Sequence, residues 1–138
     1  NILLNRKIEK IRINHICKKQ IKKGKSGTRE ILKYLKKNTS IALMIDQRVS
    51  EGKKIKFFNK LALTTTIPAQ IVSKYECDVV PIYIERYNKY YFKLIINKPL
   101  KFTKGESLEY ISERLNSLLE RMIMKNPGQW IWSHNRWK

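Results

Sequence analysis

An unbroken run of apolar residues at 41–45 stands out from the mixed pattern around it. Such a run is typical of a strand that is buried on both faces at the centre of a parallel sheet. It ends in three polar residues, Asp46, Gln47 and Arg48. Because ligands of open α/β sheets bind beyond the carboxyl ends of the strands, we expect the chemistry of the protein at these three residues. The plainer alternative is that Asp46 only caps a loop after a core strand.

The residues on either side of this run show the three- and four-residue spacing of amphipathic helices. Residues 28–37 carry isoleucine and leucine on one face and lysine on the other, which predicts a short helix. A second helix is expected to begin near Pro68, because proline fits a first helical turn, with Thr66 or Ile67 as its cap. The three threonines at 64–66 either hold an anion or oxyanion with the free N–H groups of that helix start, or only cap the helix.

The clearest helical pattern covers residues 108–123, where apolar residues recur at intervals of three and four. Thr103 and Glu106 have the spacing of a capping box in front of it. The Asn-Pro-Gly sequence at 126–128 ends the pattern. We therefore expect one long helix with an apolar inner face.

The remaining apolar stretches predict strands. Residues 79–84 and 91–97 flank a turn-like Tyr-Asn-Lys sequence, so we expect an antiparallel hairpin in which one face is more exposed. Pro81 indicates a bulge or a position beside the sheet edge. Residues 55–58 are expected to form a short extended piece. Together the elements predict an α/β fold, a mixed sheet flanked by helices, in a single domain that spans residues 1–138.

The positive charge of the chain narrows the classes of partner. The 138 residues carry a formal net charge of +19, and residues 1–40 account for +11, with 13 Lys and Arg against Glu9 and Glu30. Such an excess favours nucleic acid, an anionic membrane surface or an acidic protein as partner. A nucleotide bias of the genome that enriches Lys, Ile and Asn is a competing explanation for part of it.

The cysteine residues and the first residues of the chain indicate the cellular compartment and the extent of the protein. Cys17 and Cys77 lack metal-ligand spacing, so we expect free thiols in a reducing compartment. The sequence has no signal peptide, and no apolar run approaches the roughly 20 residues of a spanning helix. The chain opens with Asn1 and its first methionine is Met44. We therefore expect it to be the C-terminal part of a longer protein.

The last residues are rich in tryptophan. Trp130, Trp132 and Trp137 fall within eight residues. They are interpreted either as core residues or as side chains at a lipid headgroup boundary. The burial habits of large aromatic residues favour the core.

Five short motifs carry a family resemblance when they are taken in order. They are Asp46-Gln47, Phe57-Phe58-Asn59, Ala62-Leu63-Thr64-Thr65-Thr66, Val79-Val80-Pro81, and residues 127–138 with the sequence PGQWIWSHNRWK. In this order they resemble the bacterial lipid A biosynthesis acyltransferases, the lauroyl and myristoyl transferases of the late acylation steps. The resemblance runs from about Arg12 to the C-terminus.

This resemblance implies an enzyme that takes an acyl chain from acyl carrier protein and transfers it to a hydroxyl of a lipid A precursor. It implies that the enzyme acts at the cytoplasmic face of the bacterial inner membrane and has an N-terminal membrane helix. It also implies catalysis without a metal or cofactor. The implied fold is related to that of the glycerol-phosphate acyltransferases, here incomplete at the N-terminus. The basic segment 1–40 agrees with an acidic carrier protein and with an anionic membrane surface as partners.

The sequence departs from the family at its general base, a His-x4-Asp/Glu dyad. His15 is followed five places later by Gln20, and the chain ends four residues after His134. We therefore expect the dyad upstream, and the 138 residues alone to be inactive.

The resemblance also implies a set of site residues. Asp46 matches the acid of the family's second functional motif and is the candidate catalytic residue, in an orienting or arginine-pairing role that Arg12 or Arg48 would complete. The candidate substrate-binding residues are Arg12, Gln47, Arg48, Thr64, Thr65, Thr66 and Arg136.

Two alternatives belong to other functional classes. The first is a basic nucleic-acid-binding module, which the dispersed lysines and the absence of a base-stacking motif disfavour. The second is a structural fragment that binds a partner without chemistry. Binding to DNA or RNA that falls steeply with salt, without binding to a lipid A precursor, distinguishes the first from the enzyme.

Overall fold

The computed structural model describes residues 2–21 and 24–138, which form two compact units, Asn1–Ala42 and Leu43–Lys138. Lys22 and Lys23 of the basic segment lie outside the described residues. The expected single domain over residues 1–138 stays a prediction.

The first unit contains the helices α1 (Ile2–His15) and α2 (Lys25–Leu35). α2 confirms the helix predicted at 28–37, although it begins three residues earlier, and its Ile31 is buried. It ends before Asn38, whose φ of 53° is left-handed. Asparagine tolerates this conformation at a helix end better than most residues, so Asn38 suits the end of α2.

The buried strand predicted at 41–45 is wrong. These residues have no regular secondary structure, and the side chains of Leu43 and Met44 are 40% and 83% exposed. A strand needs neighbours that satisfy its N–H and C=O groups. The segment makes no such backbone hydrogen bonds to the described part of the chain, and only Ile45 packs against a core cluster.

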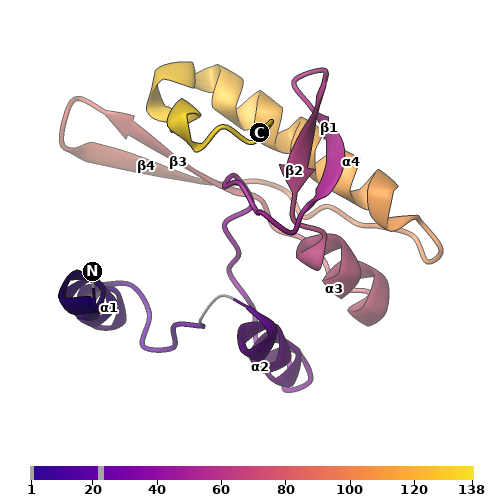
Figure 1. The fold of residues 1–138 in the computed structure, drawn as a ribbon, viewed down its shortest axis with the longest axis horizontal. Helices are drawn as coiled ribbons and strands as arrows, with labels where there is room; N and C mark the ends of the chain where they lie inside the picture. Colours follow the sequence, from indigo (N-terminus) through magenta and orange to yellow (C-terminus); the bar gives the residue numbers. More distant parts are fainter. Residues whose placement is uncertain (1, 22–23) are drawn as a thin grey trace. The chain divides into compact units, whose positions relative to one another are not determined.

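The second unit is organised around its longest helix, α4 (Leu108–Lys125), drawn in orange in Figure 1. The helix predicted at 108–123 is therefore confirmed. Its cap is Ser107, whose hydroxyl accepts a hydrogen bond from the Tyr110 N–H at 3.1 Å. The predicted cap is wrong, because Thr103 and Glu106 bond to each other at 2.7 Å through their side chains in the preceding turn.

A first hairpin packs against α4. It consists of β1 (Lys53–Phe57) and β2 (Lys60–Thr64), paired antiparallel, and its strands include most of the extended piece predicted at 55–58. Phe57 and Ala62 from its inner face form a buried cluster with Ile123 of α4. The hairpin is thereby fixed to the C-terminal half of the helix.

The helix α3 (Ile67–Tyr75) packs against α4. Its cap position is Thr66 and Pro68 lies in its first turn, as predicted. Two residues of α3, Ala69 and Val72, form a second buried cluster with residues of α4. Because β2 ends at Thr64, a two-residue connection carries the chain from the hairpin into this helix.

A second hairpin follows α3. It consists of β3 (Ile82–Tyr87) and β4 (Tyr91–Ile96), which confirms the predicted antiparallel pair. β3 begins after Pro81 and continues to Tyr87, three residues beyond the predicted end at 84, because the turn begins only at Asn88. Proline lacks the N–H that a ladder uses, so its place just before the strand agrees with its chemistry.

The described elements confirm an α/β protein. Their strands form two separate two-stranded antiparallel sheets in place of the expected single mixed sheet, because each strand pairs only with the neighbour joined to it by a short turn. Kinship to the glycerol-phosphate acyltransferase fold stays an expectation. Among the described residues no helix is both long and apolar enough to cross a membrane. The same residues contain no cluster of three or more His, Cys, Asp or Glu side chains that could hold a metal ion.

Candidate active site

A buried polar network joins segments that lie far apart in the sequence. Asn116 of α4 donates its side-chain N–H groups to the carbonyl of Lys56 at 2.9 Å and to the hydroxyl of Thr64 at 3.1 Å. Arg136 donates through Nη2 to the same hydroxyl at 2.8 Å and to Oδ1 of Asn116 at 3.1 Å. Because Thr64, Asn116 and Arg136 are all buried, these bonds replace contacts with water and hold β1, β2, α4 and the C-terminal segment together.

The guanidinium of Arg136 is fully buried, with 0% of the residue exposed, and lies 4.1 Å from the ring centre of Phe57. Its Nε and Nη1 have no hydrogen-bond partner among the described residues. Burial lowers the pKa of Arg136 below its ordinary value, and the negative charges of Asp46 and Glu120 oppose this shift. A buried charge with unpaired donors is expensive unless an anion compensates it, so Asp46 and Glu120 are its electrostatic partners.

Aromatic residues bring the second and fifth motifs together. Trp137 donates its indole N–H to the Phe57 carbonyl at 3.2 Å, and the rings of Trp130 and Trp137 lie 5.8 and 5.7 Å from that of Phe57. The core interpretation is confirmed for these two tryptophans, which pack against the buried cluster of the first hairpin. Trp132 is 45% exposed and lies 5.8 Å from Phe58.

The turn of the first hairpin is held in an unusual conformation. Phe58 and Asn59 have φ values of 48° and 60°, as the tightest hairpin turns require. A bulky residue such as phenylalanine rarely adopts this region. Glu120 of α4 accepts the Phe58 N–H at 2.7 Å and the ring of Phe58 packs against the core, so tertiary contacts fix the turn.

The segment that carries Asp46 is held by its flanks. On one side Ile45 packs against the cluster of α3 and α4. On the other side Gly52 lies so close to the end of β2 that a Cβ there would be 2.8 Å from the N and O atoms of Thr64. Asp46 is half-buried between these two points, near enough to Arg136 for its charge to act on the guanidinium.

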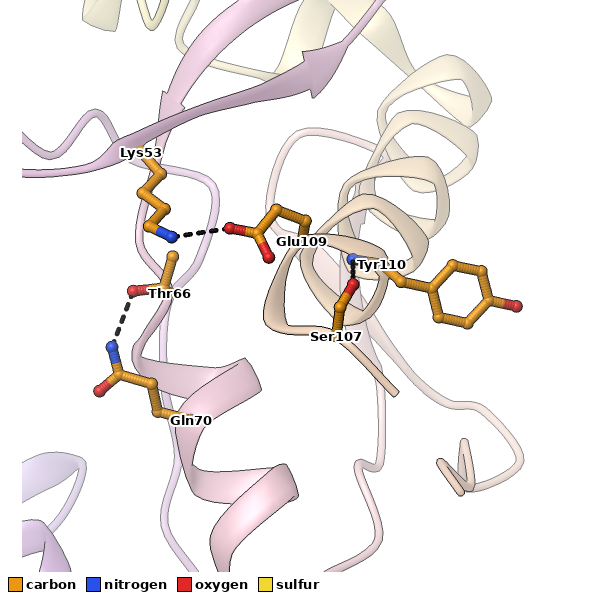
Figure 2. A network of polar contacts seen from close by, with 6 residues as sticks. All are labelled: Lys53, Thr66, Gln70, Ser107, Glu109 and Tyr110. Atoms are coloured by element: carbon orange, nitrogen blue, oxygen red, sulfur yellow. Dashed lines mark hydrogen bonds and ion pairs between the residues drawn. The ribbon is translucent and has the colours of Figure 1, made fainter. Parts of the chain in front are cut away.

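The start of α3 contains two threonine hydroxyls with local partners. Thr65 Oγ1 accepts the Ile67 N–H at 3.3 Å, and Thr66 Oγ1 accepts a hydrogen bond from the Gln70 side chain at 3.0 Å (Figure 2). Neither is fully buried. Only Thr65 bonds a backbone N–H of the helix start, since Thr66 holds the cap position without a cap hydrogen bond from its side chain. Both hydroxyls keep the capacity to donate to an anion.

An exposed ion pair lies at the starts of β1 and α4. Lys53 Nζ is 2.7 Å from Oε1 of Glu109, and Figure 2 shows the lysine reaching from the strand toward the helix. The hydrogen bond from Lys53 is the main cause that lowers the pKa of Glu109. Both side chains are more than half exposed, so the pair positions the elements but adds little to stability.

The structure brings together some of the predicted site residues. Asp46, Thr64 and Arg136 belong to one electrostatic and hydrogen-bonded group, and Thr64 continues directly into Thr65 and Thr66 at the start of α3. Gln47 is half-buried and Arg48 is exposed beside Asp46. Arg12 lies on α1 in the first unit, and its pairing with Asp46 stays a prediction.

Sequence reasoning missed Asn116 and Gln129. A signal for the first was present, since Ser112 and Asn116 are four residues apart on the otherwise apolar face of α4 and both are buried. Gln129 donates to the Ile84 carbonyl at 2.7 Å and accepts the Arg86 N–H at 2.9 Å, and so covers the outer edge of β3. Its place inside the fifth motif was the available signal.

The fold and the site define an α/β protein in which motifs from three parts of the sequence meet around one buried arginine. The sequence matches the family model of the bacterial lipid A biosynthesis acyltransferases over residues 1–138. The chain therefore belongs to this family, whose members are acyltransferases of lipid A biosynthesis. A comparison with curated proteins gave no significant match.

Proposed function

We propose that this protein transfers a fatty acyl chain from acyl carrier protein to a hydroxyl group of a lipid A precursor. The family match over the whole chain carries this proposal. In the reaction the acceptor hydroxyl gives up its proton and its oxygen attacks the carbonyl of the donor thioester. An ester bond forms, the C–S bond breaks, and the carrier thiol leaves with a proton.

The donor is proposed from charge. Acyl carrier protein is acidic, and residues 1–40 carry a net charge of +11. Opposite charge accelerates encounter more than it adds to final affinity. Two observations on the described residues of this segment support an acidic partner. Lys18 and Lys19 are solvent-accessible, and α1 has no acidic residue in its first turn.

Asp46 is proposed to act through orientation. Its half-buried carboxylate lies in the field of Arg136, whose unpaired Nε and Nη1 favour an anion nearby. A carboxylate held in this way can fix a catalytic base or a sugar hydroxyl in a productive geometry. Arg136 then acts as a positioning residue for Asp46. This role differs from the direct substrate binding that the sequence predicted for Arg136.

The acceptor is proposed to lie between Asp46 and the start of α3. Thr65 and Thr66 place hydroxyls there, and the first turn of a helix adds free N–H groups that favour negative charge. Arg48 and Gln47 would contribute a cation and an amide for the phosphates and hydroxyls of the glycolipid. The acyl transfer would take place at the cytoplasmic face of the inner membrane, where both substrates are available.

The general base is not among the proposed residues. Neither His15 nor His134 has an acid five places later, so we propose that a protein consisting of these 138 residues transfers acyl chains only slowly. General acid–base catalysis contributes roughly 10²–10⁴-fold, which sets the scale of this effect.

The test is acyl transfer by the product of the complete gene. The protein is incubated with acyl carrier protein charged with acyl chains of several lengths and with a lipid A precursor, and the lipid is analysed by mass spectrometry. The expected result is a mass increase of one acyl chain that depends on both protein and donor. Unchanged precursor with every donor, in the presence of folded protein, would contradict the proposal.

A further inference from the structure

The hairpin of β3 and β4 presents an apolar face to solvent. The register pairs Ile82 with Ile96 and Ile84 with Leu94, and it places Phe92 opposite Arg86 on the same face. The five apolar residues of this face are between 51% and 64% exposed. Single exposed apolar residues are ordinary, but a contiguous group of this kind marks a contact surface.

The orientation of this apolar face is fixed because the opposite face of the hairpin and the outer edge of β3 contact other parts of the protein. Tyr83 and Glu85 on the opposite side are half-buried, and Lys125 of α4 lies 5.9 Å from the ring centre of Tyr83. Gln129 holds the outer edge of β3 through two hydrogen bonds. The hairpin therefore cannot turn its apolar face inward without breaking these contacts.

The tip of the hairpin has the composition of a membrane-interface segment. Tyr87, Tyr90 and Tyr91 are 55%, 84% and 59% exposed, and Lys89 lies between them in the turn. Tyrosine combines an apolar ring with a hydroxyl that stays hydrated, which suits the headgroup level of a bilayer. A nearby lysine adds attraction to anionic headgroups.

We propose that the apolar face of the β3–β4 hairpin docks on an anionic lipid bilayer, with the tyrosine-rich tip at headgroup level. Charge complementarity selects this occupant. The chain carries +19, and Arg86 lies on the docking face itself, 5.3 Å from the ring centre of Phe92. Two copies meeting face to face would bring these positive charges together, whereas an anionic bilayer neutralises them. The inference draws on the proposed function only for the idea that a glycolipid acceptor is reached at a membrane.

The other hairpin supplies matched controls. Leu61 on β2 is 62% exposed, and Lys60 beside it is exposed next to the first hairpin's turn. Each repeats the chemistry of Leu94 or Lys89 on a surface without a contiguous apolar face. General loss of stability or charge would affect both hairpins, whereas docking affects only one.

The experiment is flotation of the full chain with vesicles of phosphatidylglycerol and phosphatidylethanolamine, compared with vesicles of phosphatidylcholine alone. The wild type should float with the anionic vesicles. The double variant Ile84→Asn/Leu94→Asn should bind them at least about tenfold more weakly, because two side chains no longer bury apolar surface. Lys89→Glu should weaken binding in low salt, whereas Leu61→Asn and Lys60→Glu should bind within about twofold of the wild type.

Equal flotation of the double variant and Leu61→Asn would overturn the proposal. So would loss of self-association by the double variant in sedimentation with unchanged vesicle binding, since a second copy would then cover the face. Acyl transfer measured in detergent tests the proposed function separately. Activity without vesicle docking leaves that function standing, and docking without activity leaves the lipid contact standing.

Discussion

The hydroxyl of Thr64 receives a hydrogen bond from Arg136 at 2.8 Å, although the two residues are 72 positions apart in the sequence. This bond ties the end of β2 to the tryptophan-rich C-terminal segment. A second link joins the same places through the backbone, where the Leu63 N–H donates to the Arg136 carbonyl at 2.8 Å. The family motifs at 62–66 and 127–138 thus form one structural unit that holds the chain just before α3.

Removal of the Thr64 hydroxyl should destabilise the protein. In Thr64→Val the buried donors of Asn116 and Arg136 lose a shared acceptor, which should lower the free energy of unfolding by about 2–4 kcal/mol. Urea unfolding measures the change. The control Thr39→Val alters an exposed threonine and should stay within about 0.5 kcal/mol of the wild type. Equal effects at the two positions would show that the network contributes nothing.

Arg136 should not tolerate lysine. A lysine keeps the charge but loses the planar group that lies over Phe57 and the Nη2 atom that bonds both Thr64 and Asn116. We expect Arg136→Lys to lower the free energy of unfolding by about 1–3 kcal/mol. Arg121→Lys, on the exposed side of α4, is the matched control and should change it by less than about 0.5 kcal/mol. If Arg136→Lys were as stable as the control, the planar guanidinium of Arg136 would not have the stabilising role described here.

Much of the fold could be predicted because its signals are local. The spacing of apolar residues in α4 and the proline at the start of α3 depend on neighbours within one or two turns. The segment 41–45 shows the limit, because an apolar run does not reveal whether strands are available to pair with it. The network of Asn116 and Arg136 was not predicted, since its bonds join residues from 20 to 72 positions apart. Three of the predicted site residues, Asp46, Thr64 and Arg136, nevertheless meet there.

The close approach of Gly52 to Thr64 makes glycine necessary at this position. A Cβ would lie 2.8 Å from backbone atoms of Thr64, which cannot move without disturbing β2. Gly52→Ala should therefore destabilise the protein by about 1–3 kcal/mol, as overpacking does. At Gly128 the nearest atom to a Cβ is 4.0 Å away, so Gly128→Ala should have little effect or a slightly stabilising one. Thermal unfolding of the two variants checks this. An unchanged melting temperature of Gly52→Ala would show that the loop does not pack closely against β2.

Cys77 should make stability fall at alkaline pH. Burial is the main cause that raises the pKa of Cys77 above its ordinary value of 9.0, with the charge of Asp78 adding to it. The folded protein then keeps this proton where the unfolded chain has lost it, so the stabilising contribution is complete below the unfolded pKa and is lost as pH rises through the folded one. Between about pH 8 and 10, Cys77→Ala should show a shallower loss of unfolding free energy than the wild type. A slope of Cys77→Ala equal to that of the wild type would contradict this prediction.

Asp46→Asn, assayed in the product of the complete gene, tests the proposed active site most directly, because it keeps the size of the side chain and removes its charge. The measurement is kcat/KM for acyl transfer, together with unfolding of the same variant. We predict a loss of about tenfold or more in kcat/KM, equivalent to about 1.4 kcal/mol, with the fold intact and with Asp78→Asn close to the wild type. Full activity of Asp46→Asn with lowered stability would contradict the assignment and leave Asp46 as a structural residue beside Arg136.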